Sequence, residues 1–296
     1  MYKRQVYDAD ADVKISNKIY VYLYGQELDK YKISATYIGG SMSYDIAVLK
    51  IQSDVYKESN AHAATIGKSG DMTIGDSVIA IGNPNAGGIA VTQGILSMES
   101  EYITMTAADN VSTVQIRVMR VDAAINGGNS GGGLFNDSGE LIGIVNAKVV
   151  SEKIEGMAYA IPVDFAYPAA QNILKNCDGN TNTQILRSFM GISVQVTDSA
   201  TEIADDGTVR IVNTVSVASV EANSPAAKAG VQKGDVIKSF RFASKLYLVE
   251  REYDITNIGL LFSEGDVVEI NLLRNGTEVT LSLIHISEPT RLRCIS

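Results

Sequence analysis

Histidine is scarce in this 296-residue chain, which contains only His62 and His285. Cysteine is equally rare, since Cys177 and Cys294 are too few and too far apart for a disulfide framework or a zinc site. The sequence contains no run of about 20 apolar residues, which is the length that predicts a membrane-spanning helix. Lysine and arginine form no cluster and the net charge is −9, which argues against a general nucleic-acid binder. We therefore expect no metal, no cofactor and no nucleic-acid partner.

The length and composition are those of an ordinary soluble protein. A chain of 296 residues is long enough for two domains, and its 45% hydrophobic and 20% charged residues are typical of globular domains. The two ends differ from the rest: residues 1–5, "MYKRQ", and residues 284–296, "IHISEPTRLRCIS", resemble translated sequencing-adapter read-through. No secretion signal follows Met1. We interpret both ends as non-native sequence and the chain as a fragment that is truncated at its N-terminus.

Short apolar or alternating runs, broken by Gly, Asn, Asp and Pro, fill residues 19–161 and predict many short strands. A hairpin turn is expected at residues 136–139, "NDSG". Residues 164–176 change to helical spacing, and a polar linker follows. From about residue 189 a second unit of strands and short helices begins, and "NG" at 275–276 predicts its last hairpin. The fold class is therefore dominated by β-structure.

The stretch "NGGNSGGGLF", residues 126–135, places Ser130 between glycines just before an apolar strand. A simple turn would need only one glycine, whereas this loop turns tightly and still presents a hydroxyl group. A serine hydroxyl becomes a useful nucleophile when a base, usually histidine, takes its proton. The pattern therefore favours nucleophilic catalysis by Ser130.

A wider stretch, "DAAINGGNSGGGL" (122–134), resembles the nucleophile segment of trypsin-like serine proteases, and more closely that of the HtrA/Deg family. The resemblance implies that Ser130 is the nucleophile and that the N–H groups of Gly128 and Ser130 form the oxyanion hole. Gly127 and Gly133 depart from the proline common in that family. "YDIAVLKI" (44–51) resembles the strand that carries the triad aspartate, which implies that Asp45 orients the histidine.

The segment "EGMAYAIPVD" (155–164) resembles the strand that lines the primary specificity pocket of these proteases. Gly156, Met157 and Ala158 would then pair with the extended substrate backbone. Ala124 matches the pocket floor. Because no charge stands there, the resemblance implies a preference for small or aliphatic side chains over Lys or Arg.

Two further segments resemble bacterial PDZ domains. "SPAAKAGVQKGDVI" (224–237) is similar to their most recognisable stretch, and "FMGI" matches the loop that binds a peptide carboxylate through successive N–H groups. The peptide-binding residues implied are Phe189, Met190, Gly191 and Ile192.

Together these resemblances imply a trypsin-like double β-barrel with an incomplete first barrel (6–170), a helix end and linker (171–188) and an α+β PDZ domain (189–283). The family implies a serine endopeptidase of protein quality control that acts on unfolded or damaged proteins and binds peptide C-termini. It also implies an extracytoplasmic, membrane-anchored protein that works as a trimer or larger homo-oligomer.

The family places its histidine a few tens of residues before the aspartate, which is at or just before residues 1–5 here. We therefore expect the chain as written to lack the catalytic histidine and to be inactive. His62 lies downstream of Asp45 in a polar loop, where a surface residue is the alternative to a triad base. "IGKS" (66–69) ends like a phosphate loop, but the first glycine of that motif would fall on His62. The alternative function is a non-catalytic protease-like scaffold or a PDZ peptide-binding module.

Overall fold

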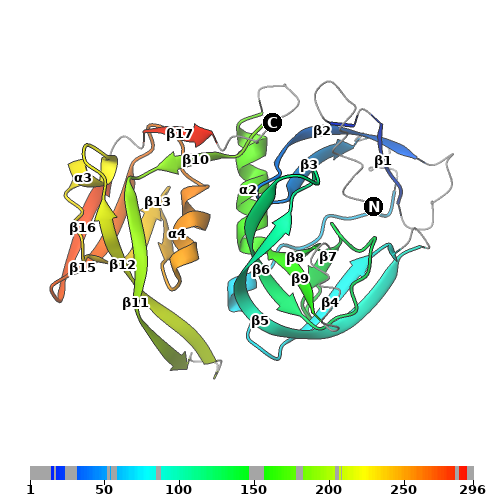
Figure 1. Cartoon of the computed structure of the whole chain (residues 1–296), viewed down its shortest axis with the longest axis horizontal. Helices are drawn as coiled ribbons and strands as arrows, with labels where there is room; N and C mark the ends of the chain where they lie inside the picture. Colours follow the sequence, from blue (N-terminus) through cyan, green and yellow to red (C-terminus); the bar gives the residue numbers. More distant parts are fainter. Residues whose placement is uncertain are drawn as a thin grey trace. The chain divides into compact units, whose positions relative to one another are not determined.

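The computed structural model describes the chain apart from residues 1–14, 17, 24–31, 52–53, 55–58, 85–87, 147–156, 178–182, 204–206, 208, 284–286 and 292–296. It divides into two compact units, one of Met1–Gln184 with Arg293–Ser296 and one of Ile185–Leu292. Figure 1 shows the elements of both units. Among the described residues, no helix has the length and apolar character needed to cross a membrane.

The first unit begins with a small antiparallel sheet. Its strands are β1 (Ile19–Val21), β2 (Ile33–Ser41) and β3 (Ile46–Ile51), in the order β1-β2-β3. A four-residue turn joins β2 to β3, and Asp45 is its last residue. This sheet therefore fixes Asp45 at the start of β3.

A closed barrel follows in the same unit. Its strands run in the order β4-β5-β6-β9-β8-β7. Apolar side chains from all six strands fill the interior, among them Val78, Leu96, Val121, Leu134, Ile142 and Ala160. The barrel strands are β4 (Ser77–Gly82), β5 (Ala90–Thr106), β6 (Thr113–Val121), β7 (Gly133–Phe135), β8 (Leu141–Asn146) and β9 (Ala158–Pro162).

The strands β5 and β6 form a long hairpin. Ile103 and Met105 are buried and alternate with exposed neighbours, so both strands continue almost to the turn at 107–112. The predicted turn at 136–139 is confirmed: Asn136 Oδ1 accepts the N–H of Ser138 at 3.1 Å, and Gly139 has a φ of 74°. The helix α2 (Val163–Lys175) follows β9, and the 3₁₀ turn η3 (Ser69–Asp71) is tied to it because Asp164 accepts from Ser69 Oγ at 2.7 Å.

The second unit has a sheet in the order β11-β12-β13-β15-β16, with β14 paired to β13 and a separate pair of β10 and β17. Its core contains Val215, Phe240, Phe262 and Ile270. The predicted final hairpin is confirmed, since Asn275 and Gly276 both have positive φ between paired Arg274 and Thr277. The elements are β10 (Leu186–Phe189), β11 (Ile192–Ile203), β12 (Val209–Val220), α3 (Pro225–Ala229), β13 (Val236–Phe242), β14 (Lys245–Leu248), α4 (Glu252–Gly259), β15 (Val268–Arg274), β16 (Thr277–Leu283) and β17 (Ser287–Arg291).

Candidate active site and peptide-binding site

Ser130 is half-buried in a tight loop between β6 and β7. Gly128 and Gly131 have φ values of 106° and 87°, a region that L-residues rarely adopt, which explains why glycines surround the serine. The Gly131 N–H donates to Val145 O, and the Val145 N–H donates to Gly132 O, both at 2.8 Å. These two bonds fasten the loop to β8 directly after the serine.

Asp45 lies against the same strand. Its side-chain Oδ2 accepts a hydrogen bond from Asn146 Nδ2 at 2.9 Å. Asn146 is 1% exposed, and its amide also contacts the sulfur of Met105. Because Val145 and Asn146 are consecutive in β8, adjacent residues hold the serine loop and the aspartate. The structure thus brings the two predicted triad residues to one end of one strand.

Asn129, the residue before Ser130, is packed closely against β4. Asn129 is 3% exposed, and its Oδ1 is buried with no hydrogen-bond partner in the described part of the chain. A Cβ added at Gly82 would lie 2.5 Å from Asn129 Oδ1 and 2.7 Å from Asn129 Cα. The end of β4 therefore leaves only enough room for glycine beneath the loop that carries Ser130.

The predicted specificity residues occupy the loop after β6 and the start of β9. Ala124 is exposed, and its carbonyl oxygen accepts from Thr92 Oγ1 at 3.0 Å. Asp122, nearby, accepts the N–H of Ile95 at 2.6 Å and so fastens this loop to β5. Met157 is half-buried and Ala158 is buried. Gly156 lies outside the described residues.

Neither histidine is placed as a base by the described residues. His62 is exposed in the segment between β3 and β4, and His285 lies outside the described part of the chain. Burial, and secondarily the carboxylate of Glu101, raises the pKa of the Tyr159 phenol in β9.

In the second unit, the loop from Phe189 to Ile192 joins β10 to β11. Met190 O accepts the N–H of Ala226 at 3.1 Å, and Gly191 O accepts the N–H of Glu221 at 2.8 Å. Gly191 has a φ of 75°, and a Cβ there would lie 2.1 Å from Ser224 Cβ, so only glycine fits. The loop carbonyls are thus directed into the domain. The helix α4 packs against β10 and β11, beside this loop.

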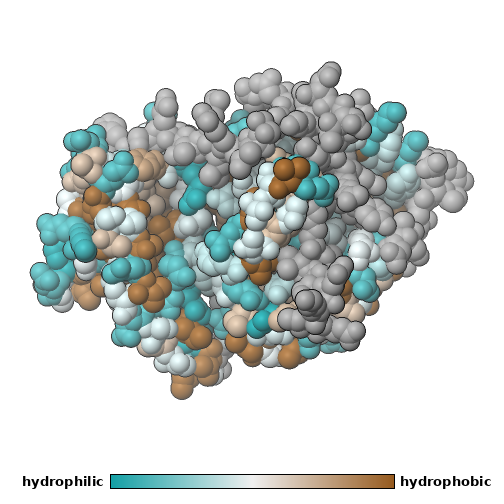
Figure 2. Space-filling view, in the orientation of Figure 1, coloured by the Kyte–Doolittle hydropathy of each residue, from teal (hydrophilic) through white to brown (hydrophobic). Residues whose placement is uncertain are grey.

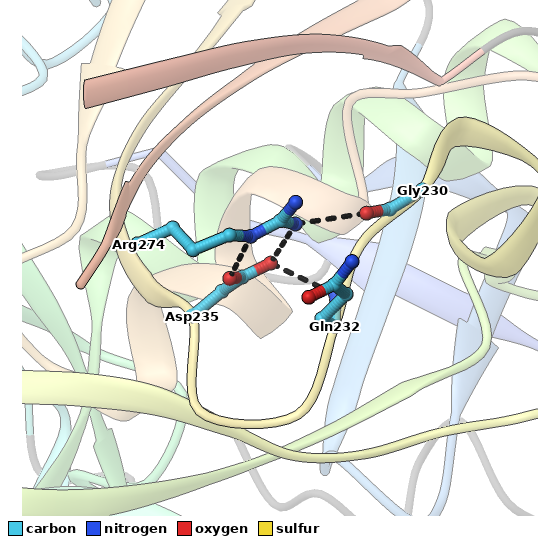
Figure 3. Close-up of polar contacts among 4 residues, drawn as sticks. All are labelled: Gly230, Gln232, Asp235 and Arg274. Carbon is cyan, nitrogen blue, oxygen red and sulfur yellow. Dashed lines mark hydrogen bonds and ion pairs between the residues drawn. The ribbon is translucent and has the colours of Figure 1, made fainter. Parts of the chain in front are cut away.

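A bidentate ion pair between Arg274 and Asp235 holds the turn that precedes β13 (Figure 3). Arg274 Nε and Nη2 donate to the two carboxylate oxygens of Asp235, each at 2.7 Å, and Nη2 also donates to Gly230 O. Asp235 is 1% exposed and accepts the N–H of Gln232. The hydrogen bonds from Arg274 lower the pKa of the Asp235 carboxyl.

Sequence reasoning missed Asn146, Gly82 and Asp122. Each acts through a contact between segments that are remote in the sequence, and no local motif marks it. Only Gly82 carried a signal, because an isolated glycine within a strand pattern suggests a close backbone approach.

Both units of the chain are similar to known proteins. Residues 7–144 match the trypsin-like peptidase domain family, and residues 188–284 match the PDZ domain family. The serine protease Do-like HtrB of Bacillus subtilis (strain 168) is 34% identical over 280 residues, which cover 91% of this chain and 56% of that protein. The probable periplasmic serine endoprotease DegP-like of Rickettsia prowazekii (strain Madrid E) is 37% identical, covering 86% of this chain and 46% of that protein.

A solved structure, "HtrA-type protease AlgW with tripeptide", superposes with a TM-score of 0.54 at 31% identity, covering 90% of this chain and 80% of that one. The chain spans about half the length of the curated relatives it matches.

Proposed function

Because this chain belongs to the HtrA family of trypsin-like serine proteases, we propose that it forms the protease and PDZ domains of an endopeptidase that cleaves unfolded or damaged proteins. The observation that carries the proposal is the shared anchoring of Ser130 and Asp45 on β8. The serine loop is bonded to Val145 and the aspartate to Asn146, so one strand sets the spacing of both groups.

The proposed reaction is acyl transfer. Ser130 Oγ attacks the scissile carbonyl carbon as a histidine takes its proton, and the same histidine then protonates the leaving amine. Asp45 orients that histidine and stabilises its charged form. The N–H groups of Gly128 and Ser130 donate to the oxyanion as charge develops, and water then releases the acyl group.

The pocket proposed for the residue before the cut contains Ala124, with Gly156, Met157 and Ala158 pairing with the substrate backbone. Support comes from Ala124, which adds no charge to this loop. A lysine or arginine entering the pocket would lose hydration without gaining a partner, whereas an aliphatic side chain gains from desolvation.

The PDZ domain is proposed to bind peptide C-termini at Phe189, Met190, Gly191 and Ile192. Support comes from the inward direction of the Met190 and Gly191 carbonyls, which suits a loop that donates N–H groups to a carboxylate. The test is a titration of the chain with an apolar-ended pentapeptide and with its C-terminally amidated twin. The free acid should bind at least about tenfold more tightly, and equal affinity would contradict the assignment.

We further propose that the polypeptide of 296 residues, as its sequence is written, turns over very slowly. No histidine precedes Asp45 in it, and His62 is exposed in a loop. Loss of one triad member leaves only the weak catalysis of the oxyanion hole and binding.

The decisive experiment compares casein cleavage by this polypeptide with cleavage by one that carries the family's histidine segment fused before residue 6. Only the second should cleave casein, and Ser130→Ala should abolish its activity. If the polypeptide without the added segment cleaves casein, and Ser130→Ala abolishes that cleavage, the base lies within the chain as written. Failure of the second, with peptide binding intact, would favour the non-catalytic scaffold.

Location and assembly are proposed from the relatives alone. The relative from Rickettsia prowazekii carries the description periplasmic, which supports an extracytoplasmic protein. A membrane anchor and a homo-oligomer of three or more copies are proposed as the family's arrangement. Sedimentation of the histidine-bearing polypeptide would test the assembly.

A further inference from the structure

The strands β11 and β12 continue well past the core of the second unit. Residues 198–203 and 209–214 pair with each other, whereas β12 is in register with β13 at the single pair Ser216↔Val236. Val217 also exchanges backbone hydrogen bonds with Gly234 and Asp235, and the Asn213 N–H donates to Glu250 O. Burial of β12 side chains begins only at Val215. Figure 1 shows this hairpin running out from the rest of the unit. We call residues 198–203 and 209–214 the arm.

The arm has one apolar face and one charged face. Because directly opposed residues share a face and the bulge at Thr197 resets the alternation, Ile203, Val209 and Ile211 lie on the same side as the buried Val215. Their exposures are 74%, 53% and 40%. Figure 2 shows apolar surface at the lower end of this unit. The alternation that buries the core face therefore continues in the arm, where none of the described residues covers these three side chains.

The opposite face carries the charges. Asp198 and Glu202 stand on β11, and Arg210 stands on β12 opposite Glu202. Asp198 Oδ1 accepts the N–H of Ser199 at 2.8 Å, so this carboxylate lies against the β11 backbone. A strand added beside β11 would meet Asp198 and Glu202 before it met Arg210.

The outer edge of β11 is continuous from the carboxylate loop into the arm. In the described part of the chain, β11 pairs with β12 alone, so its other edge is open from Ile192 to Ile203. A peptide whose C-terminus lies at Phe189–Ile192 must run antiparallel to β11. Since each residue of a strand advances about 3.3 Å on both chains, peptide residues about 6–11 positions upstream of the C-terminus reach the arm.

We propose that the arm is the second half of the peptide-binding edge and that it takes an extended segment of the same polypeptide whose C-terminus is bound. That segment alternates Lys or Arg, beside Asp198 and Glu202, with apolar residues, beside Ile203. The inference rests on the proposed PDZ function and adds the substrate class to it.

The dimensions of the apolar face favour a single strand over a second copy of the chain. Its exposed apolar side chains present on the order of 300–400 Å², which is below the roughly 800 Å² that each partner buries in a stable interface. Opposite charges and apolar pairs across neighbouring strands are each weakly favourable, and several together give about a tenfold gain in affinity.

The test is a titration of the full chain with three peptides: an apolar-ended pentapeptide, the same peptide extended upstream by eight alternating Lys and Val residues, and an extension with Glu in place of Lys. The Lys–Val peptide should bind about tenfold more tightly than the pentapeptide, and the Glu–Val peptide should not. In the D198N/E202Q variant the gain should disappear while pentapeptide affinity stays unchanged. The matched control, E264Q/E278Q, removes two exposed carboxylates elsewhere in the unit and should keep the gain.

The outcomes separate the two proposals. If the pentapeptide does not bind, the proposed PDZ function fails. If the pentapeptide binds and the Lys–Val extension adds nothing, or the Glu–Val extension adds as much, only the role of the arm is overturned. If sedimentation shows that the chain self-associates, and Ile203→Ser abolishes the association, the proposed role of the arm is overturned in favour of contact with a second copy of the chain.

Discussion

Asn146 donates a hydrogen bond from Nδ2 to Oδ2 of Asp45 at 2.9 Å, across 101 positions of sequence. The donor is almost fully buried, at the end of β8. A buried amide that donates to a carboxylate favours one direction of that carboxylate, because turning away would break this hydrogen bond in a place that water does not reach. We therefore regard Asn146 as a positioning residue for Asp45.

Changing Asn146 should have an effect that depends on pH. Asn146→Ala should lower the free energy of unfolding of the first unit by about 1–3 kcal/mol. Asn146→Asp should cost more at pH 7, because two carboxylates then face each other, and the excess cost should shrink as pH falls and one of them takes up a proton. Urea unfolding at pH 7 and pH 4 measures this, with Asn110→Asp at an exposed turn as the control. An equal cost at both pH values would contradict the contact.

The glycine beneath the nucleophile loop provides a steric test. Gly82→Ala should destabilise the first unit by about 1–3 kcal/mol, because the new methyl group overlaps Asn129. Gly127→Ala is the matched control: a Cβ there has nothing within 4 Å, so stability should be nearly unchanged. Thermal unfolding of the two variants decides the question, and similar melting temperatures would argue against the close approach.

The Asp235–Arg274 pair predicts sensitivity to acid in the second unit. Arg274 lowers the pKa of Asp235 below its ordinary 3.8, so the folded state favours the ionised carboxylate. The stability gained is complete above the unfolded-state pKa and is lost as pH falls below about 4 towards the folded-state pKa. Asp235→Asn should cost about 3 kcal/mol at pH 7, and less at pH 3.

Arg274→Lys separates charge from geometry in that pair. Lysine keeps the charge and cannot donate two parallel hydrogen bonds, so an intermediate loss is expected. Glu278→Gln, at an exposed position of β16, should change stability little at either pH. Denaturant titrations measure the free energy of unfolding of each variant. If the free-energy cost of Asp235→Asn does not vary with pH, the ion pair is not the source of that cost.

Specificity is tested in the histidine-bearing polypeptide with a peptide library. Cleavage should follow small or aliphatic residues, with catalytic efficiency at least about tenfold higher than after Lys or Arg, a difference of about 1.4 kcal/mol. Ala124→Asp should shift the preference towards Lys and Arg. Asp45→Asn and Ser130→Ala serve as inactive controls. Cleavage mainly after Lys or Arg by the unchanged enzyme would refute the role of Ala124.

The sequence predicted the parts of the fold that depend on local chemistry. The turns at Asn136 and Asn275 follow from backbone requirements that two or three residues satisfy alone, and the glycines around Ser130 mark a loop whose φ values exclude other residues. The hydrogen bond from Asn146 to Asp45 could not be predicted in this way, because the amide reaches the carboxylate only when β8 has taken its place in the barrel. The length of the arm escaped prediction for a related reason: Ile203 and Ile211 alternate like core residues, although both are exposed in the described structure.

The limited pairing between β12 and β13 affects the dynamics of the second unit. The only register pair between β12 and β13 in the described residues is Ser216↔Val236, and the backbone hydrogen bonds that join β12 to residues 234, 235 and 250 stop at Asn213, so residues 198–203 lie outside the ladder that binds β13, β15 and β16 together. Amide protons of residues 198–203 should therefore exchange with deuterium through local opening, well before those of β15. A peptide seated along β11 would slow that exchange selectively, giving a residue-by-residue record of how far up the strand it extends.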